Sequence, residues 1–80
     1  MEKICIVYHP ESNCWAIHSP ITCPDLTPFP KYFYKEYEVQ KESCPLVYDN
    51  LIDLMCNLNR KKITPSKEKN IFPELTDLLK

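Results

Sequence analysis

The chain contains no glycine, although it contains eight prolines. Glycine-rich phosphate-binding loops need residues without a Cβ, so neither a P-loop nor a dinucleotide-binding fingerprint is present. Turns must instead be built from Pro, Asn, Asp and Ser. These facts exclude the nucleotide-binding classes that depend on a glycine loop.

Long apolar segments are also missing. No run approaches the ~20 residues of a membrane-spanning helix. The N-terminal sequence MEKICIVYHP lacks the long apolar region of a secretory signal. We therefore expect a cytoplasmic protein without a membrane partner. If the protein comes from a phage, a hypothesis based on composition that is given below, this location is the cytoplasm of the host cell.

Neither sign of charge predominates, with 10 Lys and Arg against 11 Asp and Glu. This balance argues against a polyanion binder driven by bulk electrostatics, and equally against an acidic DNA mimic. Five cysteines, an odd number without a signal sequence, favour reduced thiols over a disulfide framework. The length of 80 residues predicts one small domain, residues 1–80.

Residues 45–60 carry the clearest helical pattern. At about 100° per residue, two apolar rows run side by side along this segment. Ser43 and Pro45 suit the N-cap and the first turn. The first row is Val47, Leu51, Leu54 and Leu58, and the second is Tyr48, Ile52 and Cys56. Together they exceed the ~100° arc that a surface helix buries. We expect the second row to lie under the C-terminal segment or to contact another molecule.

Residues 3–9 and 14–19 are rich in β-branched and aromatic side chains, which predicts a β-hairpin around the turn Pro-Glu-Ser-Asn. A register that pairs His9 with Cys14 separates two faces, and a slip by one residue would mix them. One face carries Ile4, Ile6, Tyr8, Trp15 and Ile17, and the other carries Cys5, Val7, His9, Cys14, Ala16 and His18. We expect the first face to pack on the helix.

Three further segments complete the predicted fold. Residues 20–30 hold four prolines and should form an extended connection, pinned by Ile21, Leu26 and Phe29. Residues 32–39 are predicted as a third strand with Phe33, Tyr37 and Val39 on one face, although a helix over residues 31–40 also fits. Residues 73–79 predict a short helix with Leu75, Leu78 and Leu79 facing inward. The predicted class is α+β.

The second hairpin face combines two histidines with two cysteines, which raises the question of a zinc site. Cys5 and His9 lie about 13 Å apart on one strand. Zinc needs its ligands within ~2.0–2.3 Å, so the four side chains cannot share one ion. A site would need further ligands from Cys23, Cys44 or elsewhere, and no C-x-x-C motif exists. We predict no metal and no cofactor, and keep a small zinc protein as the second alternative.

No catalytic constellation is evident. A Cys–His pair on an exposed hairpin lacks an orienting third group and an oxyanion loop. Asp49 and Asp53 lie on the polar face of the predicted helix, where solvated carboxylates are common. We therefore expect a protein that is not an enzyme.

The segment at residues 31–37 interleaves aromatic and basic side chains: Lys31, Tyr32, Phe33, Tyr34, Lys35 and Tyr37. Such a pattern can stack nucleic-acid bases. However, Glu36, Glu38 and Glu42 stand in or beside it and are expected to repel phosphates. Exposed tyrosines equally suit a protein interface, because they offer a large amphipathic area.

The sequence as a whole predicts a small protein-binding module, an inhibitor or adaptor that occupies the surface of a larger protein complex. The expected partner-binding residues are Tyr32, Tyr34, Tyr48, Ile52 and Cys56, and a homo-oligomer through the last three is compatible. The Lys, Asn and Ile content suits a phage or mobile-element protein that blocks a host system. The alternative is a nucleic-acid-binding module that uses the Tyr32–Tyr37 segment and the basic loop at residues 60–69.

Overall fold

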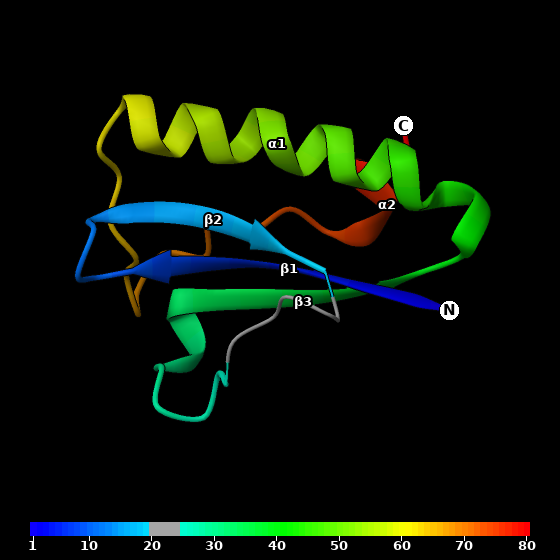
Figure 1. Cartoon of the computed structure of the whole chain (residues 1–80). Helices are drawn as coiled ribbons and strands as arrows, with labels where there is room; N and C mark the ends of the chain where they lie inside the picture. The colour runs from blue at the N-terminus through cyan, green and yellow to red at the C-terminus, as the bar shows by residue number, and fades with distance from the viewer. Residues whose placement is uncertain (20–24) are drawn as a thin grey trace.

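The computed structural model describes residues 1–19 and 25–80, so the expectations for Ile21 and Cys23 lie outside the described residues. Strand β1 spans Glu2–His9, β2 spans Cys14–His18 and β3 spans Tyr34–Val39. Helix α1 spans Cys44–Arg60, and α2 spans Leu75–Leu78. The strands form an antiparallel sheet in the order β2-β1-β3, and α1 crosses one face of it (Figure 1). The α+β class is confirmed.

The hairpin has the predicted register. His9 pairs with Cys14, and Cys5 pairs with His18. The face expected to meet the helix does so, and it forms the main core with the first row of α1. The buried members of this core are Ile4, Ile6, Tyr8, Trp15, Tyr37, Val39, Val47, Leu51, Leu58 and Leu78. Leu54 and Ile17 are only partly buried and pack against it. Alternation in the sequence therefore predicted the inner face of the sheet.

The third strand is shorter than predicted, and the helical alternative for residues 31–40 is wrong. Residues Lys31–Phe33 form a 3-10 turn, in which the Phe33 amide donates to the Pro30 carbonyl at 2.9 Å. The Phe33 ring still reaches the core side, where it meets Tyr8 edge to face with centroids 5.5 Å apart. The turn redirects the chain out of the proline-rich connection before β3 begins.

The C-terminal helix is also shorter than predicted, since α2 begins two residues beyond Pro73. The Pro73 carbonyl accepts a hydrogen bond from the Tyr37 hydroxyl at 2.7 Å, which ties this residue to the sheet instead of a helical turn. Leu78 is buried as expected, whereas Leu79 is 40% exposed and the prediction that it faces inward is wrong.

Helix α1 ends in a Schellman-type turn without the usual glycine. The Ile63 amide donates to the Leu58 carbonyl at 3.0 Å, and the Lys62 amide donates to the Asn59 carbonyl at 3.2 Å. Lys62 therefore takes a φ of 56°, and Asn13 in the hairpin turn takes a φ of 53°. Asn tolerates this left-handed conformation better than Lys does, since its short polar side chain can bond locally. At the other end, Ser43 occupies the N-cap position without a side-chain capping bond.

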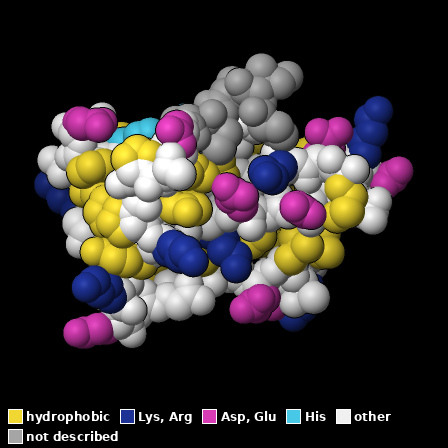
Figure 2. Space-filling model, turned by 90° about the horizontal axis from the view of Figure 1, so that it is seen from below, with side chains coloured by type: hydrophobic (Ala, Val, Ile, Leu, Met, Phe, Trp, Pro, Cys, Tyr) yellow, Lys and Arg dark blue, Asp and Glu magenta, His cyan; other side chains and the backbone are white. Residues whose placement is uncertain are grey.

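The opposite face of the sheet is partly covered by the segment after residue 24. Leu26 packs on Cys5 and Val7, with Phe29 and Tyr34 beside them. The Asp25 carboxylate accepts hydrogen bonds from the Thr27 hydroxyl and amide, and these lower the pKa of Asp25. Figure 2 shows hydrophobic side chains gathered toward one end of this face, with charges of both signs interspersed over the rest.

Trp15 joins the edge strand β2 to α1. Its amide donates to Asn59 Oδ1 at 2.7 Å, and its carbonyl accepts from Asn59 Nδ2 at 3.1 Å. The Asn59 side chain thus pairs with the outer edge of β2 as a neighbouring strand would, and an edge with satisfied backbone groups is protected against pairing with other chains. The indole N–H donates to the Ile63 carbonyl at 2.8 Å.

Replacing Asn59 with Ala should lower the free energy of unfolding by about 1–3 kcal/mol, because two part-buried backbone groups of Trp15 lose their partner. Asn57→Ala is the matched control on the same helix. The Asn57 side chain accepts an exposed bond from Arg60, so the change should stay within about 0.5 kcal/mol. Urea denaturation compares the two, and equal midpoints would contradict the clamping role of Asn59.

Candidate functional site

A cleft of about 290 Å³ lies where the start of β3 meets the segment that follows α1. Its lining comes from two stretches separated by more than the length of α1. It consists of Lys31, Tyr32, Tyr34, Lys35, Ser66, Lys67, Lys69, Asn70 and Phe72. The structure therefore brings together parts of the aromatic segment and of the basic loop that the nucleic-acid alternative required, whereas Tyr37 and residues 60–62 do not line the cleft.

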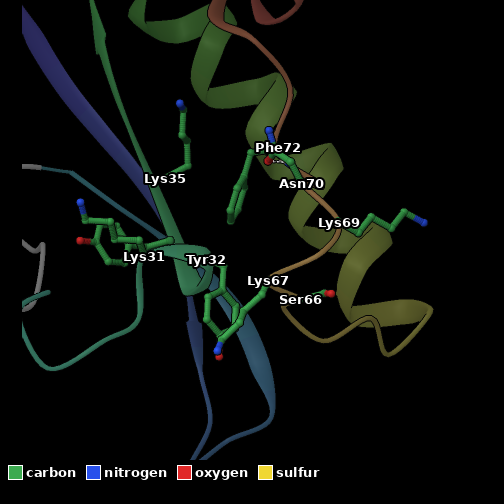
Figure 3. A pocket seen from close by; sticks show the side chains of 9 residues that line it. Lys31, Tyr32, Lys35, Ser66, Lys67, Lys69, Asn70 and Phe72 are labelled. Atoms are coloured by element: carbon green, nitrogen blue, oxygen red, sulfur yellow. Dashed lines mark hydrogen bonds between the residues drawn. The ribbon is translucent and has the colours of Figure 1, made fainter.

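The lining residues surround the cleft in a definite arrangement (Figure 3). Phe72 projects from the C-terminal segment toward the space between Lys35 and Tyr32. Lys31 and Lys69 extend outward on opposite sides of the cleft. Tyr32 and Phe72 thus lie between these two lysines in this view.

The charged side chains that line this cleft are four lysines, and no carboxylate is among its lining residues. The ion pairs of the described residues are Lys3 with Glu36 and Lys80 with Asp77, and neither includes a cleft lysine. Lys35 Nζ lies 5.9 Å from the centre of the Tyr37 ring. The cleft is therefore a local basic site within a chain of net charge −1.

The glutamates expected to repel phosphates do not line the cleft. Strand alternation places the Glu36 side chain on the face opposite to Lys35, where it pairs with Lys3 at 3.5 Å. Their expected repulsion of phosphates stays a prediction, and none of the three lines the cleft.

Local hydrogen bonds shape the wall that the C-terminal segment provides. The Glu68 amide donates to Ser66 Oγ at 3.2 Å, and the Phe72 amide donates to Asn70 Oδ1 at 3.0 Å. The Phe72 ring also meets Trp15 edge to face with centroids 5.7 Å apart. These contacts hold Phe72 against the core while it lines the cleft.

The Tyr37 hydroxyl anchors the same segment through its bond to the Pro73 carbonyl. Burial, and next the negative charge of Glu74, raise the pKa of Tyr37 above its ordinary value. The folded protein therefore favours the neutral hydroxyl, which is the form that can donate this bond.

The predicted partner-binding residues divide between two places. Tyr32 and Tyr34 lie in the cleft and are half-buried. Tyr48, Ile52 and Cys56 lie along α1, where Tyr48 is 42% exposed, Cys56 is exposed and Ile52 is half-buried. The five residues do not line one cleft, so we treat the three on α1 as a separate surface, the helix row.

Helix α2 docks on the other flank of α1. Asn50 Nδ2 donates to the Leu78 carbonyl at 2.7 Å, and Asn50 and Ile52 are about 200° apart around a helix. Of the two alternatives for the helix row, cover by the C-terminal leucines is therefore wrong, and Tyr48 and Cys56 are exposed.

The predicted Cys–His pairs are neighbours in register but do not form a metal cluster. In residues 1–19 and 25–80, no group of three or more His, Cys, Asp or Glu side chains is arranged to hold an ion. The two histidine rings approach each other instead. Cys14, Cys44 and Cys56 have free thiols, and Asp49 and Asp53 are exposed on α1.

Two cleft residues lie outside the segments predicted from the sequence: Asn70 and Phe72. The only available signal was the apolar pair Ile71–Phe72 directly before a proline, which marks a segment that must pack somewhere. The spacing of residues in the sequence could not show which residues face this segment across the cleft.

Comparison with protein families, curated proteins and solved structures finds no match. Within the part of the chain that the structure describes, no helix has both the length and the apolar character needed to cross a bilayer.

Tyr37→Phe should destabilise the protein by about 0.5–1.5 kcal/mol at neutral pH by removing the bond to Pro73. In the unfolded chain Tyr ionises near pH ~10, and its folded pKa is higher. The stabilisation from Tyr37 is therefore present below that pH and is lost as the pH rises above it. Urea unfolding between neutral and alkaline pH should show a smaller alkaline loss for Tyr37→Phe than for wild type. Tyr48→Phe, at an exposed position, is the control and should behave as wild type.

Proposed function

We propose that this chain is a non-enzymatic module that binds single-stranded nucleic acid at the cleft between β3 and the C-terminal segment. The observation that carries the proposal is the lining of the cleft, four lysines around aromatic side chains without a carboxylate. Bases stack on aromatic rings regardless of sequence, and a basic groove follows the backbone.

The spread of the lysines favours a strand over a free nucleotide. Lys31 and Lys69 extend to opposite sides (Figure 3), an arrangement that suits successive phosphates of a strand better than one phosphate. The volume of about 290 Å³ suits one base or two stacked against Tyr32 and Phe72. The absence of any glycine loop is consistent with this mode, because stacking and lysine contacts require no such loop.

Binding of a fluorescent single-stranded oligonucleotide, followed by polarisation, should weaken as salt rises. The slope of log K against log salt is about −0.7 for each phosphate neutralised on a single strand. Lys67→Gln and Lys35→Gln should each reduce this slope by about 0.7. Tyr32→Ala should weaken binding by about 1–3 kcal/mol, whereas Tyr32→Phe retains the ring.

Lys61→Gln is the matched control, since it removes the same charge from an exposed position outside the cleft. It should leave the slope close to that of wild type. Absence of binding at low salt would contradict the proposal, as would equal effects of Lys61→Gln and Lys67→Gln. Equal affinity for a mononucleotide would indicate a small-molecule site instead.

The helix row supports a second candidate function, a protein-binding inhibitor or adaptor. Tyr48 and Cys56 are exposed beside half-buried Ile52, and α2 docks elsewhere on α1. Tyrosine and apolar side chains together are typical of the centre of a protein interface.

Ile52→Asp should abolish capture of one specific host complex in a pull-down, because a charge would be buried at the interface. Asp53→Asn is the neighbouring control and should retain capture. A light-scattering mass of a dimer that returns to a monomer in Ile52→Asp would indicate self-association instead. Identical capture by wild type and Ile52→Asp would contradict a role for the helix row.

A further inference from the structure

The rings of His9 and His18 meet on the face of the sheet that lies away from α1. Their Nε2 atoms are 3.1 Å apart, with ring centroids at 5.4 Å and planes inclined by 78°. The two residues are not paired in register, since His9 pairs with Cys14 and His18 with Cys5. Ala16 lies between Cys14 and His18 on the same face. Its small side chain leaves room for the two long rings to meet.

This separation equals the spacing of two ligands on one transition-metal ion. Zn–N bonds of ~2.0–2.1 Å give two nitrogens about 3.3 Å apart at a tetrahedral angle and about 2.9 Å apart at a right angle. The value of 3.1 Å lies between them. Imidazole nitrogen is a preferred donor for Zn²⁺, Ni²⁺ and Cu²⁺.

We propose that His9 and His18 form a two-histidine chelate for a divalent transition-metal ion, with water at the remaining positions. In the hydrogen-bonded pair one Nε2 carries a proton and the other accepts it. On metal binding the donor ring carries its proton on Nδ1 instead, so both Nε2 lone pairs become ligands without net loss of a proton. Among the described residues no third protein ligand joins them, so the chelate is exchangeable and unlike a closed structural zinc site.

The surroundings suit such a chelate. The His9 ring meets Phe29 edge to face with centroids 6.1 Å apart, which supports its orientation. Histidine atoms reach the surface beside the hydrophobic end of this face (Figure 2), so an ion can enter from solvent. Both donors already lie at ligand spacing, so binding requires that the rings turn until both lone pairs converge on the ion. The ion would link β1 to β2 across the hairpin.

Calorimetric titration of the full reduced chain with NiCl₂ tests the proposal. His9→Gln and His18→Gln should each weaken binding by about tenfold or more, because a chelate becomes a single ligand. Cys14→Ser is the control, since Cys14 is the thiol paired with His9 in register, and it should change the affinity less than about twofold.

Thermal unfolding gives the second readout. Ni²⁺ should raise the midpoint of wild type and of Cys14→Ser, and should not raise that of either histidine variant. Circular dichroism verifies that each variant is folded, and if His18→Gln does not fold, His9→Gln at the end of β1 decides. Wild-type binding no tighter than that of His9→Gln would overturn the chelate. A loss of binding in Cys14→Ser would assign the metal to the thiol and overturn it equally.

Discussion

The pairing of Asn59 with the backbone of Trp15 is the constraint on which the rest of the structure depends. It fixes the edge strand to α1, while the indole binds the Ile63 carbonyl at the end of the same helix. The ring of Trp15 packs on Tyr8 at 5.2 Å and on Phe72 at 5.7 Å. One residue therefore contacts the hairpin, the helix terminus and the C-terminal segment, and the cleft inherits its shape from that junction.

Charge segregation explains how a nearly neutral chain can present a basic site. Alternation along β3 directs Lys35 and Glu36 to opposite faces, so Lys35 lines the cleft whereas Glu36 pairs with Lys3. The overall balance that argued against a polyanion binder is an average over both faces. Short-range attraction is governed by the charges within about one Debye length, ~8–10 Å, and the charged side chains that line the cleft are all lysines.

The local sequence pattern was sufficient to predict the sheet, because burial on one face of a strand leaves a period of two in the sequence. It was also sufficient to predict the main helix, whose apolar rows follow the helical period. It failed where side chains from distant segments meet. The lengths of β3 and α2 depended on Pro30 and on the bond from Tyr37 to Pro73, and the approach of Lys67 to Tyr32 depended on the path of the chain after α1. The register correctly paired each histidine with a cysteine. It could not show that the histidine rings, longer than the thiols, would reach each other diagonally over Ala16.

The positive φ of Lys62 strains the native state, and the lack of glycine that causes this strain also lowers the conformational entropy of the unfolded chain. A left-handed lysine costs the native state on the order of 1 kcal/mol, a penalty that glycine would avoid. Glycine would also give the unfolded chain more conformations to lose on folding, and proline gives it fewer. With eight prolines and no glycine, the disordered ensemble of this chain is already narrow. The small core therefore has to outweigh a smaller loss of backbone entropy on folding. This reduction, spread over the whole sequence, offsets the strain at the end of α1.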